Sequence, residues 1–150
     1  MNPEDQKAVD SLYAEASCGD QHALTFLRVW HLYCHRIDNF IDEGKKDPHE
    51  LLSILIQANV LYSLPFYSQN ANHLFPIVAQ VTNAYADSIA WANNREEWRR
   101  QWADTLRFAG NDMVLAVALL QGGFDLMRKL SPIAREISWA CHHDEAGNPD

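Results

Sequence analysis

The placement of glycine and proline constrains the fold of this chain more than any other feature of its sequence. Both residue types fall almost entirely where a helix could begin or end, and the stretches between them are rich in Ala, Leu, Gln, Glu and Arg. The sequence contains no internal repeat and no low-complexity tract. It therefore predicts an all-α protein, a single-domain bundle of about six helices.

Residues that favour helix ends divide the chain into its predicted segments. An Asp or Asn side chain can cap a helix start, proline fits the first turn, and glycine adopts the left-handed conformation that ends a helix. The predicted helices are residues 3–18 between Asn2 and Gly19, 21–43 between Asp20 and Gly44, 48–64 between Asp47 and Pro65, 74–92, 95–121 between Asn94 and Gly122, and 124–141. We expect Pro132 to bend or divide the last helix, because proline lacks an amide donor.

The length of 150 residues suits one domain with one core. We expect a helical domain over residues 1–141 and a mobile C-terminal tail over residues 142–150. The composition, 47% hydrophobic and 21% charged, is that of a globular chain. The longest apolar run, Met113 to Leu120, is far shorter than the roughly 20 residues that cross a bilayer, so we predict no membrane span.

Charge and cysteine usage indicate the compartment and exclude one class of partner. Twelve basic and twenty acidic side chains give a net charge of -8, which repels nucleic acid, so we predict no nucleic-acid partner. The first residues lack the apolar segment of a secretion signal, so we expect a cytoplasmic protein. Cys18, Cys34 and Cys141 are odd in number and lack C-x-x-C spacing, which predicts buried reduced thiols without a bridge.

Four side chains that can ligate metals recur at helical spacing in the second predicted helix: His31, His35, Asp38 and Asp42. At about 100° per residue they fall within a sector of about 60°, so they form one row along the helix. Two carboxylates one turn apart suit Mg²⁺, whereas imidazole favours zinc or a first-row transition metal. The row therefore predicts a metal site; the alternative interpretation is the solvated edge of an amphipathic helix.

The segment from Tyr33 to Glu43 resembles the first aspartate-rich motif of the squalene/phytoene synthase group of helical isoprenoid synthases. Cys34 stands at the family's cysteine, Asp38 and Asp42 at its first and last aspartates, Asn39 where many members have a second aspartate, and His35 at the usual arginine, with Arg36 one place displaced. The resemblance implies an isoprenoid-synthase-like fold of reduced size. The resemblance also implies that the aspartates bind Mg²⁺, which in turn binds an isoprenyl diphosphate.

The second aspartate motif of that family has only a partial counterpart in this chain. In the fifth predicted helix Asp104 and Asn111 share a face, and Asp112 lies about 100° away. If this helix opposes the second, metal ions between them could neutralise a diphosphate, with Arg36, Arg107 or Arg128 as hydrogen-bond donors to the phosphate oxygens. A solvated helix flank is the alternative interpretation, and no catalytic residue is assigned.

Three functional interpretations stay open at this point. The first is Mg²⁺-dependent binding or processing of an isoprenyl diphosphate-like ligand. The second is a non-enzymatic interaction module or homodimer, with Trp98, Trp102 and Leu106 as a dimer seam. The third is an all-α nucleotide pyrophosphohydrolase-like enzyme, whose characteristic E-x-x-E and E-x-x-D pairs are missing here.

Overall fold

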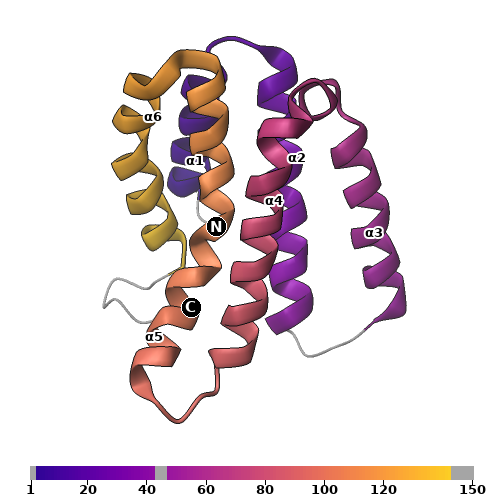
Figure 1. Cartoon of the computed structure of the whole chain (residues 1–150), viewed down its shortest axis with the longest axis vertical. Helices are drawn as coiled ribbons and strands as arrows, with labels where there is room; N and C mark the ends of the chain where they lie inside the picture. Colours follow the sequence, from indigo (N-terminus) through magenta and orange to yellow (C-terminus); the bar gives the residue numbers. More distant parts are fainter. Residues whose placement is uncertain (1–2, 43–46, 143–150) are drawn as a thin grey trace.

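The computed structural model of the chain describes residues 3–42 and 47–142, and all regular structure in them is helical. The elements are α1 (Pro3–Ser17), α2 (Gln21–Asp42), α3 (Pro48–Ser63), α4 (Pro65–Trp91), α5 (Glu97–Leu106), the 3₁₀ helix η1 (Arg107–Asn111) and α6 (Asp112–His142) (Figure 1). The predicted all-α class is confirmed. The predicted end of the second helix at Glu43 and Gly44, the cap at Asn2, and residues 143–150 of the predicted tail lie outside the described residues.

The sequence-predicted caps act at two helix starts. The Asp20 carboxylate accepts hydrogen bonds from the backbone amides of His22 and Ala23, at 2.8 and 3.2 Å. The carboxylate of Asp47 accepts one from the amide of His49 at 2.9 Å. Because these bonds satisfy amides that lack partners inside the helix, they fix where α2 and α3 begin.

The middle of the chain differs from the prediction in two places. The predicted helix 74–92 begins earlier, at Pro65, and α4 passes through a kink at Asn70, whose φ and ψ are −116° and 17°. The predicted helix 95–121 is broken: α5 ends at Leu106 and η1 intervenes before α6. Asn94 does not cap it directly, since its side chain accepts from the amide of Glu96 and α5 starts one residue later. Hydrogen bonds that join η1 to α2 and to the second half of α6 stabilise this break.

A sharp reversal at Gly123 divides α6 into two halves. This residue has φ 78° and ψ −173°, a backbone conformation that essentially only glycine adopts. The first half runs through the bundle and the second half returns beside α1 (Figure 1). The predicted helix end at Gly122 is thus confirmed. Pro132 does not divide the second half, which continues to His142, so the chain tolerates the loss of one amide donor there.

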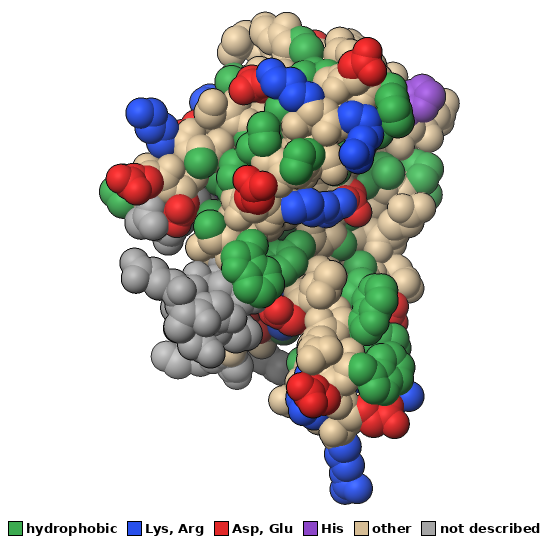
Figure 2. Space-filling model, turned by 90° about the vertical axis from the view of Figure 1, so that its left-hand side faces the viewer, with side chains coloured by type: hydrophobic (Ala, Val, Ile, Leu, Met, Phe, Trp, Pro, Cys, Tyr) green, Lys and Arg blue, Asp and Glu red, His purple; other side chains and the backbone are tan. Residues whose placement is uncertain are grey.

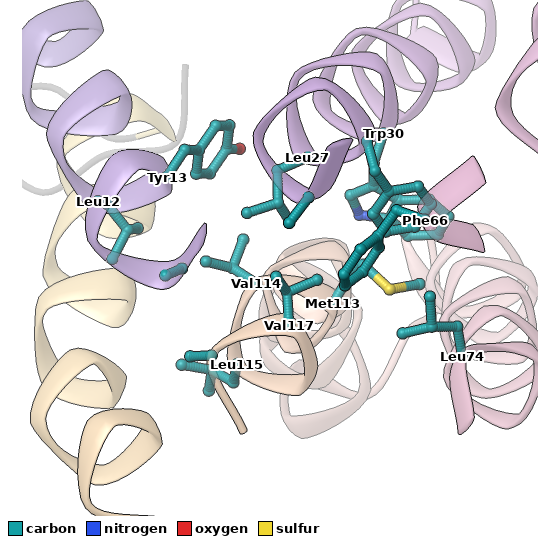
Figure 3. Close-up of a cluster of buried hydrophobic side chains, with 14 of the residues drawn as sticks. Leu12, Tyr13, Leu27, Trp30, Phe66, Leu74, Met113, Val114, Leu115 and Val117 are labelled. Atoms are coloured by element: carbon teal, nitrogen blue, oxygen red, sulfur yellow. The ribbon is translucent and has the colours of Figure 1, made fainter. Parts of the chain in front are cut away.

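The core lies between α1, α2, α4 and the first half of α6 (Figure 3). Its fully buried side chains include Leu27, Leu74 and Met113, which come from three different helices. The first half of α6 lies at the centre of the bundle, and most of its turns carry buried side chains. Helix α3 lies at the edge of the bundle against α2 and α4, and contributes only Leu61 to this cluster.

Within the described residues, no helix by itself has the length and hydropathy of a membrane span. Helices α3 and α4 meet both criteria only when taken together, and a bend of 94° separates them.

Candidate functional site

A pocket of about 310 Å³ lies between α1, α2, η1 and the second half of α6. The row predicted on α2 forms one side of it: His31, His35, Asp38 and Asp42 all line the pocket. Their shared side follows from the helical spacing, which repeats every three to four residues. The row of histidines and aspartates on α2 therefore faces a pocket between packed helices.

Arg107 of η1 joins the two aspartates of the row. Its guanidinium donates to the carboxylate of Asp38, and to both oxygens of Asp42 at 2.9 and 3.3 Å. Its Nε donates to Ser88 Oγ of α4 at 2.8 Å. Burial alone would lower the pKa of Arg107, but the hydrogen bonds and charges of Asp42 and Asp38 outweigh it and raise that pKa. Arg107 is therefore a permanent cation whose donors are engaged on three sides.

The position of Arg107 affects whether the carboxylates of Asp38 and Asp42 can bind a metal ion. A Mg²⁺ site needs carboxylate oxygens that point at the ion, supplemented by waters or phosphate. Here the guanidinium of Arg107 lies where a bridging cation would lie between Asp38 and Asp42. Among the described residues, no group of three or more His, Cys, Asp or Glu side chains is arranged to hold a metal. As placed, the two carboxylates bind an arginine, and a Mg²⁺ ion would have to displace it.

Two further hydrogen bonds fix η1 as a wall of the pocket. The indole Nε1 of Trp30 donates to the carbonyl of Gly110 at 2.9 Å, which ties η1 to α2. The amide of Asn111 donates to Ser138 Oγ, which ties η1 to the second half of α6. A Cβ on Gly110 would lie 3.4 Å from the Cys34 sulfur, which shows how closely η1 approaches α2.

A tyrosine and two histidines form a further polar part of the lining. Tyr13 Oη and His31 Nδ1 lie 3.1 Å apart, and the His31 and His35 rings are parallel, with centroids 6.2 Å apart. Burial, followed by the nearby Cys34, Cys141 and Asp10, raises the pKa of Tyr13, so its hydroxyl keeps its proton at neutral pH. The Tyr13 hydroxyl is therefore uncharged and can form hydrogen bonds with a ligand or with His31.

The thiols are less uniform than the sequence suggested. All three are free, and Cys34 and Cys141 are partly buried and line the pocket. Burial, with a smaller contribution from the Asp38 charge, raises the pKa of Cys34 to about 12, so it is an uncharged thiol at neutral pH. Cys18 is exposed, which corrects the expectation that all three are buried; it follows the last turn of α1 and has φ 48°.

The structure brings together six of the ten predicted site residues: His31, His35, Asp38, Asp42, Arg107 and Asn111. The other four, Asp104, Asp112, Arg36 and Arg128, are not among the lining residues. Asp112 instead accepts a hydrogen bond from Arg135 at 2.7 Å, and Arg36 and Arg128 are exposed. The break at η1 explains the separation on that side, because Asp104, Asn111 and Asp112 do not belong to one continuous helix.

Sequence reasoning missed Tyr13, Tyr85, Ser88 and Ser138. The spacing of Val9, Leu12, Tyr13 and Ala16 marks a buried face of α1, and a tyrosine on such a face usually needs a polar partner. That signal could have placed Tyr13 near the site. The two serines carried no such signal, since each lies inside a helix and its partner at the site comes from a distant segment.

Comparison with protein-family models, with characterised proteins and with solved structures finds no match to this chain. The resemblance to the squalene/phytoene synthase group thus rests on the segment from Tyr33 to Glu43 alone.

Proposed function

We propose that this chain binds a small amphipathic organic cation, an amine with an aromatic or aliphatic tail, in the pocket beside α2. The observation that carries the proposal is the saturation of Arg107. Among the described lining residues it is the only lysine or arginine, and its donors are already directed at Asp38, Asp42 and Ser88. A ligand anion would have to compete with those partners, whereas a ligand cation would not.

The charge of the cluster favours a cation. Two carboxylates and one guanidinium leave a formal charge of −1, and the whole chain carries −8. The side chain of Asp42 is 58% exposed, so its carboxylate can accept further hydrogen bonds while it holds Arg107. A protonated amine placed there would form a charge-assisted hydrogen bond, which is stronger than a neutral one.

The rest of the lining suits the organic part of such a ligand. Rings of Trp30, Tyr85 and Phe108 contribute to the wall, and aromatic faces attract cations. Val9, Leu12 and Ile137 add aliphatic surface on which a tail can be buried. The volume of about 310 Å³ is at the lower end of the range for sites that hold small organic molecules.

Calorimetric titration with two probes of nearly the same shape and opposite charge tests the proposal. Phenethylamine should bind, and 3-phenylpropionate should not. The substitution Asp42→Asn should weaken phenethylamine binding by about tenfold or more, because one charged hydrogen bond contributes about 1.5–3 kcal/mol. Asp125→Asn is the matched control: it removes the same charge from an exposed position on α6 that does not line the pocket. Preferential binding of the anion would overturn the proposal.

The isoprenyl diphosphate-like ligand and the reduced isoprenoid-synthase-like fold are the second proposal. The location of Asp38 and Asp42 in a pocket with an apolar wall supports it. This second proposal requires an anionic ligand where the first requires a cation, and the diphosphate must compete with both aspartates for Arg107. Geranyl diphosphate, titrated with and without Mg²⁺, tests it. Mg²⁺-dependent heat that Asp38→Asn abolishes, without binding of phenethylamine, would favour this second proposal over the first.

A further inference from the structure

Helix α3 presents an apolar face to solvent. The side chains of this face are 46% to 64% exposed: Leu51, Leu52, Leu55, Ile56 and Val60. Within α3 only Ile54 and Leu61 are buried. Figure 1 shows the reason, since α3 lies at the outer edge of the bundle and none of the described helices covers its far side. A face of this kind marks an interaction surface more often than scattered single apolar residues do.

This face also belongs to the longest charge-free part of the chain. From Leu51 to Ala86 the sequence contains no Asp, Glu, Lys or Arg, although the chain carries 32 such residues in total, 12 basic and 20 acidic. The opposite side of the molecule differs: there acidic and basic side chains are interspersed among the apolar ones (Figure 2). The apolar face of α3 is therefore both exposed and electrically neutral.

We propose that the apolar face of α3 binds the same face of a second copy of this chain. Two copies that each carry −8 repel one another, so a contact between them is favoured only where neither copy brings charge into it. A two-fold contact places the same patch on both partners, and an apolar helix face without charges is complementary to itself. The charge pattern thus selects a second copy over a partner that would be recognised by complementary charge.

A lipid surface is the main competing occupant, and the charges disfavour it. Helices that lie on membranes carry Lys or Arg on their polar face, which attracts anionic lipids. Helix α3 has neither, and its one charged residue among the described positions is Glu50. The seam predicted at Trp98 and Trp102 is less suited to self-association, since Arg99 covers the Trp98 ring at 5.1 Å and brings charge to that surface.

Light scattering after size exclusion, repeated over a range of protein concentrations, tests the proposal. Wild type should approach twice the 17.1 kDa mass of one chain as concentration rises. Leu55→Glu should weaken this dimer by about 30-fold or more, because the substitution buries a charge at the centre of the contact. Phe124→Glu is the matched control, since Phe124 is 63% exposed but lies on α6. It should leave the dimer unchanged.

A crosslink covers the case in which Leu55→Glu loses helical structure by circular dichroism. Ile56 lies near the middle of α3, so in a two-fold contact it comes close to its own copy. Ile56→Cys in a Cys18→Ser background should form a covalent dimer under mild oxidation. Three results would overturn the proposal: a wild type that stays monomeric, an equal effect of Phe124→Glu, or flotation of the monomer with zwitterionic vesicles that Leu55→Glu abolishes.

Discussion

Arg107 donates a hydrogen bond to Asp38, a residue 69 positions earlier in the chain, and both side chains are more than four-fifths buried. The contact joins η1 to α2 across the wall of the pocket. Through Asp42 and Ser88 the same guanidinium reaches a second turn of α2 and the last turn of α4. One side chain therefore fixes the relative position of three segments and sets the charge of the site.

Removal of that side chain should destabilise the fold. Arg107→Met leaves the Asp38 carboxylate partly buried without its cation, which we expect to cost about 2 kcal/mol in the free energy of unfolding. Urea denaturation followed by circular dichroism measures it. Arg128→Met, at an exposed position on α6, should change stability by less than about 0.5 kcal/mol. If Asp38→Asn does not recover part of the loss in the double variant, the charge of Asp38 is not the cause.

The cap of α2 should make stability depend on pH. Hydrogen bonds from the amide of Ala23, and then of His22, lower the pKa of Asp20 in the folded state below its ordinary value of 3.8, against a smaller effect of desolvation. A lowered pKa stabilises the fold above the unfolded value, and that contribution is lost as pH falls through the folded value. Asp20→Asn keeps the cap but cannot ionise. Wild type should therefore be the more stable at about pH 7, and the difference should disappear in acid, as pH falls through the lowered pKa of Asp20.

Asp20→Ala removes the cap itself and should cost about 1 kcal/mol at neutral pH. Thermal and urea unfolding of wild type, Asp20→Asn and Asp20→Ala, at about pH 7 and in acid, compares their stabilities. A difference between wild type and Asp20→Asn that does not change with pH would contradict the assignment.

The cysteines should differ in their reactivity. Burial holds the Cys34 pKa at about 12, so near pH 8 only a small fraction is thiolate, the form that reacts. Cys18 is exposed. Alkylation by iodoacetamide, followed by peptide mass spectrometry, should label Cys18 at least about 100-fold faster than Cys34. Denaturant should remove the difference. Equal rates in the folded protein would show that the pocket admits solvent to Cys34 more freely than its burial indicates.

The reversal in α6 should require glycine. Gly123→Ala places a side chain at φ 78° and ψ −173°, which we expect to cost about 1–3 kcal/mol. No heavy atom lies within 4 Å of the added Cβ, so the whole loss would come from the backbone. Gly110→Ala is the control, because its Cβ would meet Cys34 and Trp30 only at 3.4 to 3.9 Å, which is ordinary van der Waals contact, and its φ is not in the left-handed region; we expect a change within about 1 kcal/mol. Urea denaturation of both variants decides this.

The starts of α2 and α3 could be predicted because a cap is a local interaction. Asp20 and Asp47 bond to amides two or three residues away, so the sequence around them already contains both partners. The end of the first half of α6 was predictable for a similar reason, since the ability of Gly123 to adopt a positive φ does not depend on distant residues. Part of the candidate site followed as well: the α2 row needed only the helical repeat.

The break between α5 and α6 could not be predicted from the local sequence. Residues 97–121 are compatible with one continuous helix, and a stripe of apolar side chains runs through them. Competing hydrogen bonds from Trp30 to Gly110 and from Asn111 to Ser138 hold η1 in place, and both partners come from elsewhere in the chain.

The amino-acid sequence by itself determined that this chain is helical, where several helices begin and end, and that four ionisable side chains share one side of α2. Only the tertiary structure decided that Arg107 binds the aspartates of that row and that the apolar face of α3 stays uncovered. The physical reason is distance along the chain. Caps and helical periodicity act over a few residues, whereas an ion pair over 69 residues, or the absence of a covering helix, depends on how all the helices pack.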